Sequence, residues 1–165
     1  MKIQLKILKT NTVTEQWVGW LNNKDVFKYS EQRFKTHTKH TQKKFLKNKI
    51  KDKSCVLFKI YFNKIHIGMA EINNIDNYHK HCEIMYFIGE KLFWNKGIAT
   101  KVIKNLITYA KKEIGIKKIY AGIYEKNFSS KRVLLKNNFL IEGRIKKFFK
   151  YKNTRIDKII FGKIT

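Results

Sequence analysis

The hydrophobic residues of this chain recur with two different periods, and each period predicts one kind of element. Residues 3–8 alternate between apolar and polar, which predicts a half-buried first strand. Residues 81–88 carry an apolar run that predicts a buried strand. From 101 to 114 the apolar residues recur every three or four positions, which predicts a helix with one apolar face. A loop containing Gly97 joins this strand to this helix.

The other segments extend this pattern into a complete order of elements. Thr12 or Thr14 caps a first helix that runs through Leu21 and is stopped by Asn22-Asn23, and the stretch 36–41 supplies caps for a second helix. The remaining predicted elements are strands over 55–62 and 65–72 joined at Asn63-Lys64, a strand over 117–124 parallel to 81–88, a helix over 129–137, and antiparallel strands over 139–149 and 155–164. This order predicts one mixed α/β domain over residues 1–165, with a central mixed sheet of about seven strands and about four helices.

The junction between the 81–88 strand and the next helix favours an anion. The first turn of a helix has backbone N–H groups without intrahelical acceptors, and the helix dipole adds about half a positive charge there. Gly97 and Ala99 are small enough to let an anion approach the backbone. The spacing also fits an ordinary strand-to-helix connection, so the surrounding motif must decide between the two interpretations.

The string Trp94-x-x-Gly97-x-Ala99 resembles the acetyl-CoA loop of the GNAT superfamily of acetyltransferases. The form here is similar to that of the branch with ribosomal-protein N-terminal acetyltransferases and nucleotide-amino-sugar acetyltransferases. The predicted order of elements matches the GNAT fold from end to end, so the resemblance covers essentially the whole chain. Further strings that fit the family are Trp20-Leu21-Asn22, Ile67-Gly68, Cys82-Glu83-Ile84, Asn127-x-x-Ser130, Asn138-Phe139-x-x-Glu142-Gly143 and Asp157.

The resemblance implies that acetyl-CoA binds along the central strand and the loop after it. Its pyrophosphate would rest on backbone amides, with one lysine as a counter-charge. The implied residues are Trp94, Asn95, Lys96, Gly97, Ile98, Ala99 and Thr100. Pantetheine would pair like an extra strand with the backbone of Tyr86, Phe87 and Ile88, where GNAT strands splay apart. Asn127 is the implied amide contact to the cofactor arm, and no metal is implied.

The implied reaction is direct attack of a primary amine on the thioester, which requires an uncharged nitrogen. Glu83 and Glu71 are the carboxylates placed to accept its proton, through water, although a strand glutamate can instead point to solvent or pair with a lysine. Many GNAT enzymes carry a tyrosine that protonates the thiolate, and this chain has Leu134 at that position. Ser130 is then the predicted proton donor or water holder, and its alternative role is that of a first-turn helix residue.

The acceptor is less well specified than the cofactor. The acceptor contacts that the branch implies are Trp20, Asn22, Tyr29 and Arg33, while His81 either lines the same pocket or lies on the surface. Arg33 and the positive charge favour a small phosphorylated amine such as a nucleotide-linked amino sugar. The rival acceptor is a protein amino terminus, for example on a ribosomal protein. A rival class of function is a non-catalytic basic module that binds RNA or CoA.

Composition limits the other partners. The 165 residues include 37 Lys and Arg and 12 Asp and Glu, which gives a formal net charge of +25. Such a charge attracts polyanions, but the lysines are spread along the whole chain, so we favour generic lysine enrichment over a nucleic-acid site. Basic and aromatic residues alternate over 144–155, which suits RNA binding or the two faces of a hairpin, and we favour the hairpin.

We expect a cytoplasmic protein with free thiols and no metal site. No apolar run approaches the roughly 20 residues of a membrane span, and the first residues alternate like a strand rather than forming a signal peptide. Cys55 and Cys82 lie in apolar strand-like runs, which favours buried free thiols over a disulfide. The histidines show no zinc-ligand spacing. The sequence leaves the oligomeric state open and is compatible with a homodimer.

We predict that Gly97→Trp weakens acetyl-CoA binding, because the indole would obstruct the loop on which the diphosphate rests. Calorimetric titration of acetyl-CoA into the variant and the unaltered protein measures the effect. Equal affinities would contradict the placement of the cofactor loop.

Overall fold

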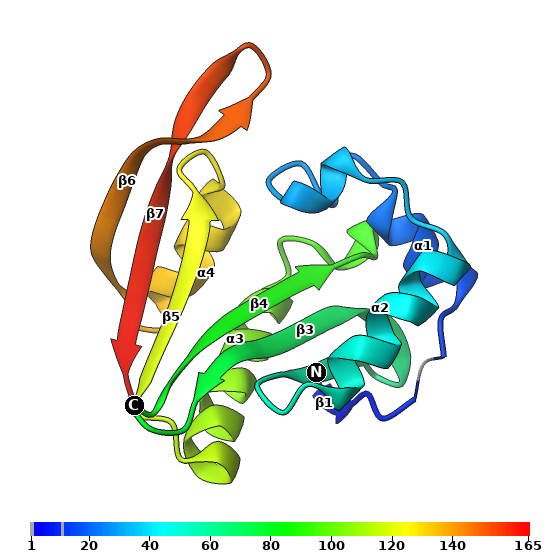
Figure 1. The fold of residues 1–165 in the computed structure, drawn as a ribbon, viewed down its shortest axis with the longest axis horizontal. Coiled ribbons are helices and arrows are strands. Elements are labelled where there is room, and N and C mark those ends of the chain that lie inside the picture. Colours follow the sequence, from blue (N-terminus) through cyan, green and yellow to red (C-terminus); the bar gives the residue numbers. More distant parts are fainter. Residues whose placement is uncertain (1, 11) are drawn as a thin grey trace.

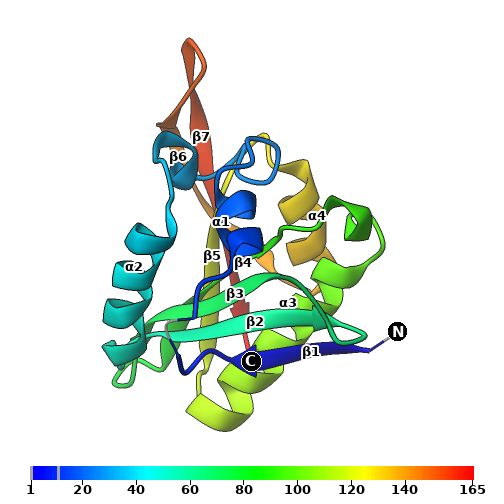
Figure 2. The same ribbon diagram turned by 90° about the vertical axis from the view of Figure 1, so that its right-hand side faces the viewer.

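A seven-stranded sheet runs through the protein, with helices against both of its faces (Figures 1 and 2). The computed structural model describes residues 2–10 and 12–165, and all counts refer to these residues. The strands are β1 (Ile3–Ile7), β2 (Val56–Phe62), β3 (Ile65–Asp76), β4 (His81–Ile88), β5 (Lys118–Tyr124), β6 (Leu140–Tyr151) and β7 (Thr154–Ile164), in the spatial order β1-β2-β3-β4-β5-β7-β6. Only the β4–β5 pair is parallel among the paired strands of the described chain.

Four α-helices and three short helical segments connect these strands in the described chain. They are α1 (Glu15–Leu21), α2 (Lys39–Lys51), α3 (Ile98–Tyr109) and α4 (Phe128–Lys136), with the 3-10 segments η1 (Glu31–Phe34) and η2 (Lys91–Phe93) and the π-helical segment η3 (Ala110–Ile114). The order of elements is the predicted one, which confirms the mixed α/β fold class.

Side-chain caps explain where the first two helices begin. The Trp17 N–H donates to Thr14 Oγ1 at 3.2 Å, so Thr14 is the N-cap of α1. The Thr41 N–H donates to Thr38 Oγ1 at 3.1 Å, and the Thr41 hydroxyl returns a contact to the backbone of Thr38, which completes a capping box. Both caps lie within the stretches that the sequence indicated.

The turns between strands also follow local chemistry. Asn63 and Lys64 have φ angles of 44° and 76°, which is the backbone that a two-residue hairpin turn requires between β2 and β3. The predicted end of β3 at residue 72 was too early. Pairing continues to Asp76, because an irregularity in the register keeps this polar end beside the start of β4. Likewise, the helix predicted over 101–114 begins three residues earlier and ends in the π-helical segment.

The sheet separates two hydrophobic cores. On one face, Val102, Ile103 and Leu106 of α3 pack against sheet residues such as Ile72 and Ile84. On the other face, three side chains of α1 and Leu46 of α2 pack against Leu57 and Met69; the α1 residues are Trp17, Trp20 and Leu21. Each such fully buried aliphatic side chain stabilises the fold by about 1.5–3 kcal/mol. The two cores therefore hold α3 and α4 on one side of the sheet and α1 and α2 on the other (Figure 2).

The sheet splits between its two central strands. β4 pairs with β5 only at His81, Cys82 and Glu83, while β4 remains paired with β3 as far as Ile88. β5 remains paired with β7 along its whole length. The two halves of the sheet therefore diverge beyond Glu83, as the separating arrows of β4 and β5 show (Figure 1). The predicted splay is present in the structure.

Other expectations concern thiols and membranes. Both cysteines are free; Cys82 is buried as predicted, whereas Cys55 is only half-buried because it precedes β2 near the surface. Within residues 2–10 and 12–165, no three His, Cys, Asp or Glu side chains are grouped so that they could hold a metal ion. The described helices include none with the length and apolarity needed to cross a membrane.

We predict that Gly89→Ala destabilises the fold by about 1–3 kcal/mol through overpacking. A methyl group on Gly89 would lie 2.1 Å from Cδ2 of the buried Trp20 indole, which has no room to move. Urea denaturation measures the loss. Gly19→Ala is the control, because it meets nothing within 4 Å on an exposed position of α1 and should be neutral or stabilise by up to about 1 kcal/mol. Equal stability of the two variants would contradict the prediction.

Candidate active site

Every second residue of β4 directs its backbone N–H and C=O groups into the split. The Gly89 N–H donates to the Ile67 carbonyl of β3 at 2.8 Å. Because successive strand residues direct their backbone groups to opposite sides, those of Ile88 and Tyr86 face the split instead. Within residues 2–10 and 12–165, no strand pairs with this edge beyond Glu83. Two of the three predicted pantetheine residues, Tyr86 and Ile88, therefore direct their backbone groups into the split. The backbone of Phe87 faces β3 instead, and its ring packs on Phe27.

Trp94 closes part of this edge. Its indole Nε1 donates to the Ile88 carbonyl oxygen at 2.8 Å, and its ring packs against the α3-side core. Trp94 therefore attaches the loop after β4 to the end of that strand. The backbone groups that remain for a ligand are the N–H of Ile88 and both groups of Tyr86.

The N-terminus of α3 is open to an anion. Gly97 is its N-cap with a φ of 72°, and none of the described side chains caps the first turn. The positive φ angles of Gly97 and Asn95 turn the loop so that Asn95, Lys96 and Gly97 are exposed. The first-turn amides belong to Ile98, Ala99 and Thr100, and the Ile98 side chain is buried, so it contributes through its backbone. The structure thus brings together all seven predicted loop residues at one helix N-terminus.

Across the split, the start of α4 presents two more of the predicted residues. Asn127 is the N-cap of α4, since its Oδ1 accepts the Ser130 N–H at 3.2 Å. In the described part of the chain its Nδ2 makes no hydrogen bond, so this donor is available to a ligand. The Ser130 hydroxyl lies 3.5 Å from the Tyr86 hydroxyl of β4. These two hydroxyls therefore meet where β4 and α4 face each other.

The Tyr86 phenol was not among the groups predicted from the sequence, which gave this residue a role only through its backbone. Burial raises the pKa of Tyr86, against a smaller opposing effect of Ser130, so the phenol keeps its proton at neutral pH. Leu134 lies one turn after Ser130 and is buried in the core, 2% exposed. A buried phenol from β4 thus faces the start of α4, the helix that carries Leu134.

Glu83 lies at the closed end of the split, where the β4–β5 pairing stops. Its Oε2 accepts the Asn74 Nδ2–H at 3.0 Å. Burial raises the pKa of the Glu83 carboxyl above its ordinary value, while the Lys158 ammonium and the Asn74 amide oppose that effect. The Lys158 chain reaches this position because Gly122 has no side chain; an added Cβ there would lie 2.4 Å from Lys158 Cε. A half-buried carboxyl with a raised pKa suits a general base.

Glu71, the second predicted base, has a different environment. Its Oε1 accepts the Lys49 ammonium of α2 at 2.7 Å and the Cys55 thiol at 3.2 Å. This ion pair joins β3 to α2, one strand further from the split than Glu83. The contact is the structural alternative that the sequence analysis named for a strand glutamate. Between the two carboxylates, the geometry favours Glu83.

Three of the five predicted acceptor residues hold the protein together. Trp20 is 6% exposed, and its Nε1 donates to Glu90 Oε1 at 3.0 Å. The Asn22 amide uses both ends on one residue, since its Nδ2 donates to the His37 carbonyl at 2.8 Å and its Oδ1 accepts the His37 N–H at 2.9 Å. These contacts leave Trp20 and Asn22 with structural roles that the sequence pattern did not indicate.

Arg33 does not present its guanidinium to a phosphate. Its Nη1 donates to the carbonyls of Lys28 and Ser30 at 3.2 Å each, and its Nη2 donates to the Lys150 carbonyl of β6 at 2.7 Å. Arg33 therefore bridges η1 to the β6–β7 hairpin. Three of its five N–H donors thus bind backbone oxygens, which gives Arg33 a structural role in place of the expected phosphate contact.

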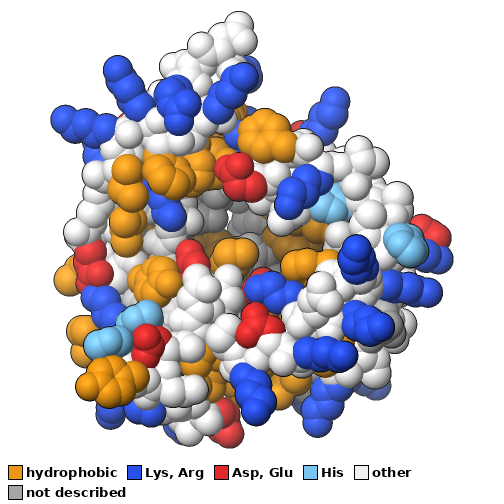
Figure 3. All heavy atoms as spheres, in the orientation of Figure 1, with side chains coloured by type: hydrophobic (Ala, Val, Ile, Leu, Met, Phe, Trp, Pro, Cys, Tyr) orange, Lys and Arg blue, Asp and Glu red, His pale blue; other side chains and the backbone are white. Residues whose placement is uncertain are grey.

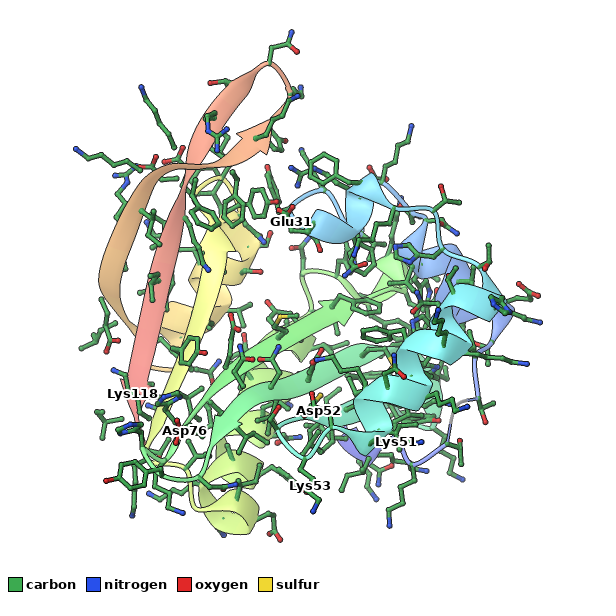
Figure 4. All side chains as sticks on the ribbon, viewed as in Figure 1. Glu31, Lys51, Asp52, Lys53, Asp76 and Lys118 are labelled. Carbon is green, nitrogen blue, oxygen red and sulfur yellow. The ribbon has the colours of Figure 1, made fainter. Side chains whose placement is uncertain are left out.

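An aromatic cluster, formed by Tyr29, Tyr124, Phe149 and Tyr151, covers the open side of the split. Tyr29 stacks on Tyr151 with ring centroids 5.6 Å apart, and Tyr124 stacks on Phe149 at 3.6 Å. Glu31 of η1 accepts the Tyr124 hydroxyl; burial and this hydrogen bond raise the pKa of Tyr124 to about 12. Figure 4 shows Glu31 between η1 and the end of β5, and Figure 3 shows the surface hollowed between the two halves of the molecule.

Of the five, Tyr29 thus lies beside the hollow, whereas His81 lies at the closed end of the split. His81 Nε2 is 3.8 Å from Asp76 Oδ2, and its backbone pairs with Lys118. Figure 4 places Asp76 and Lys118 at the end of the sheet away from Glu31. His81 and the aromatic cluster therefore lie at opposite ends of the split.

The chain belongs to the acetyltransferase (GNAT) domain family, whose sequence profile matches residues 7–140. YoaA of Bacillus subtilis (strain 168), named as an uncharacterized N-acetyltransferase, is 28% identical over 96 residues, which is 58% of this chain and 54% of YoaA. The chain spans about half the length of the curated relatives that it matches.

Solved structures show the same fold at lower sequence identity. Spermidine N-acetyltransferase from Vibrio cholerae, in complex with CoA and spermine, has a TM-score of 0.86 at 18% identity, covering 98% of this chain and 95% of that chain. RimL, an alpha-N-protein acetyltransferase of a ribosomal protein, in complex with coenzyme A, has a TM-score of 0.86 at 15% identity, covering 98% and 93%. These similarities establish the fold of the chain.

We predict that Glu83→Gln lowers turnover by about 100-fold, as expected for loss of a general base, and leaves acetyl-CoA affinity unchanged. The base works when ionised, so kcat/KM of the unaltered protein should rise with pH through the raised Glu83 pKa, and the variant should lose this rise. Because the folded-state pKa is raised, the ionised carboxylate destabilises the fold at neutral pH, and the variant should be at least as stable there. An unaltered rate would contradict the assignment.

Glu71→Gln should behave differently, because it removes the partner of the half-buried Lys49. We predict a loss of about 1–3 kcal/mol in the free energy of unfolding, with turnover per folded molecule retained. Urea denaturation and steady-state kinetics on the same samples distinguish the two glutamates. A large loss of turnover at unchanged stability would move the base role to Glu71.

Proposed function

We propose that this chain is an acetyl-CoA-dependent N-acetyltransferase that transfers an acetyl group to a primary amine. The observation that carries the proposal is the split between β4 and β5. Its unpaired edge has an uncapped helix N-terminus near one end and the half-buried Glu83 carboxylate at the other. Membership of the GNAT family supports this function, as do structural neighbours in complex with CoA.

In this proposal the exposed backbone donors have two tasks. The first-turn amides of α3, with Lys96 beside them, hold the diphosphate of acetyl-CoA. Acetyl-CoA supplies a thioester whose carbonyl carbon the amine attacks. The N–H groups of Tyr86 and Ile88 face the split, where one of them donates to the carbonyl oxygen and stabilises the negative charge that develops on it.

Proton transfers follow from the positions of the side chains. As the C–N bond forms, the amine nitrogen loses a proton to Glu83 through water. As the C–S bond breaks, the thiolate takes a proton from the hydroxyl pair of Ser130 and Tyr86, which lie 3.5 Å apart. The CoA thiol has an ordinary pKa of about 8.5, so this donor assists without being essential.

The lining of the hollow bears on the acceptor. Arg33 was one reason to expect a nucleotide-linked amino sugar, but its guanidinium donates to backbone carbonyls, which weakens that expectation. The aromatic cluster and Glu31 instead suit a cationic amine. An α-amino group has a pKa of about 7.7–8.0 and is partly uncharged at neutral pH, so one carboxylate base suffices. A protein amino terminus is therefore our preferred acceptor, and RimL acts on such a substrate.

Thiol release from acetyl-CoA tests the proposal directly. The unaltered protein is assayed with a peptide bearing a free α-amino group, the same peptide with a blocked amino terminus, spermidine, and a nucleotide-linked amino sugar. We expect turnover with the free peptide and none with the blocked one. Fastest turnover of the amino sugar or of spermidine would overturn the preferred acceptor. Binding of acetyl-CoA without turnover of any amine would overturn the enzymatic function and favour a CoA-binding module.

A further inference from the structure

The β6–β7 hairpin exposes both of its faces near its tip. Basic and aromatic residues alternate over 144–155, a pattern that a hairpin explains when one of its faces is buried. The hairpin is present, but Ile145 and Phe148 of β6 are 41% and 47% exposed. Phe149 and Tyr151 turn toward the aromatic cluster instead. The exposed phenylalanine and the lysines beside it therefore need another explanation.

A bulge in β6 brings these residues to the surface. The register of β6 against β7 shifts over residues 146–148, which together stand opposite Asp157. Lys147 at the centre of the bulge has a φ of 50°, and its N–H donates to Asp157 Oδ1 at 2.8 Å. Arg155 of β7 donates to the Lys147 and Phe148 carbonyls at 2.6 and 3.0 Å. A bulge held in this way re-aims the side chains that it carries, here two lysines and one phenylalanine.

An open groove of about 660 Å³ lies near the tip of the hairpin, lined by Lys147, Lys150, Lys152, Asn153, Thr154 and Arg155. In the part of the chain that the structure describes, none of the three lysines forms an ion pair. Figure 3 shows Lys and Arg side chains gathered over this end of the molecule. Because Phe149 and Tyr151 face the aromatic cluster, Lys150 between them points away from it. The groove is thus a cationic surface separate from the hollow.

Cations beside an exposed aromatic ring fit single-stranded nucleic acid. Lysines neutralise phosphates along the strand, and an aromatic ring provides a face on which a base stacks. The Phe148 ring is held in place by an edge-to-face contact with Phe149, with centroids 4.9 Å apart. An acidic peptide would contact the lysines equally well, but its carboxylates would make no use of the ring. The combination therefore favours a nucleic acid over an acidic protein segment.

We infer that the outer face of the β6–β7 hairpin binds single-stranded nucleic acid, with phosphates in the groove and a base stacked on Phe148. This function goes beyond the proposed acetyl transfer, because it uses none of the residues assigned to acetyl-CoA or to the amine. The two can therefore fail separately: an inactive enzyme can bind RNA, and an active one can fail to bind it.

The first test measures the binding of a fluorescent single-stranded RNA of about 12 nucleotides by anisotropy, between about 50 and 200 mM salt. The variant combines Lys147→Gln, Lys150→Gln and Lys152→Gln. We expect its affinity to fall about tenfold at the lowest salt. The slope of log affinity against log salt should decrease by about 2, as expected for the loss of three phosphate contacts. Urea denaturation should show unchanged stability, since these side chains are exposed.

A matched variant separates the groove from the net charge of the chain. It combines Lys43→Gln, Lys44→Gln and Lys47→Gln, three exposed lysines on α2, and so removes the same charge elsewhere. We expect its RNA affinity to change less than about twofold. Equal losses in the two triple variants would show attraction by overall charge only and would overturn the inference. Absence of RNA binding by the unaltered protein would also overturn it.

The second test concerns the aromatic ring. Phe148→Ala should lower RNA affinity about tenfold with an unchanged salt slope, as expected for the loss of one stacked base, and Phe148→Tyr should retain the affinity. Tyr78→Ala is the control, because Tyr78 is 87% exposed in the turn between β3 and β4 and should leave RNA binding unaltered. Unchanged affinity in Phe148→Ala, together with displacement of the RNA by an equal concentration of a glutamate-rich peptide, would indicate an acidic protein partner and overturn the assignment to nucleic acid.

Discussion

The loss of pairing between β4 and β5 beyond Glu83 is the constraint on which the rest of the structure depends. A strand edge inside a sheet leaves backbone donors and acceptors that must find partners. Here β4 stays with β3 and β5 stays with β7, so neither strand can satisfy the other. The Trp94 indole takes one of the freed carbonyls, and the groups of Tyr86 remain for a ligand. The fold thus leaves unpaired backbone groups, which are energetically unfavourable, at the place where the proposed chemistry occurs.

Close packing keeps β4 on its side of the split. Gly68 allows the Phe87 carbonyl to approach, since an added Cβ would lie 2.2 Å from that oxygen, and Gly89 leaves room for the Trp20 indole. On the opposite side, Arg33 ties η1 to the β6–β7 hairpin through the Lys150 carbonyl. The aromatic cluster fills the space that this bridge defines. The walls of the hollow therefore come from segments that are far apart along the chain.

Acidic groups have separate uses around this hollow. Glu83 keeps a raised pKa because burial outweighs its hydrogen bond and the nearby lysine, whereas Glu71 forms an ion pair with Lys49. Glu31 accepts a tyrosine hydroxyl beside the aromatic cluster. The site thus contains several carboxylates although the whole chain has a formal net charge of +25. An excess of lysine on the outer surface does not require a phosphorylated acceptor within.

The sequence by itself determined the order of elements and the position of the loop before α3, because both depend on local signals: hydrophobic periods, threonine caps at Thr14 and within 36–41, and Gly97 before a helix. It could not decide the roles of Trp20, Asn22 and Arg33, whose respective partners Glu90, His37 and Lys150 are set by the folded chain. Nor could it separate Glu83 from Glu71, because a long-range ion pair such as that of Glu71 with Lys49 forms only when distant segments pack together.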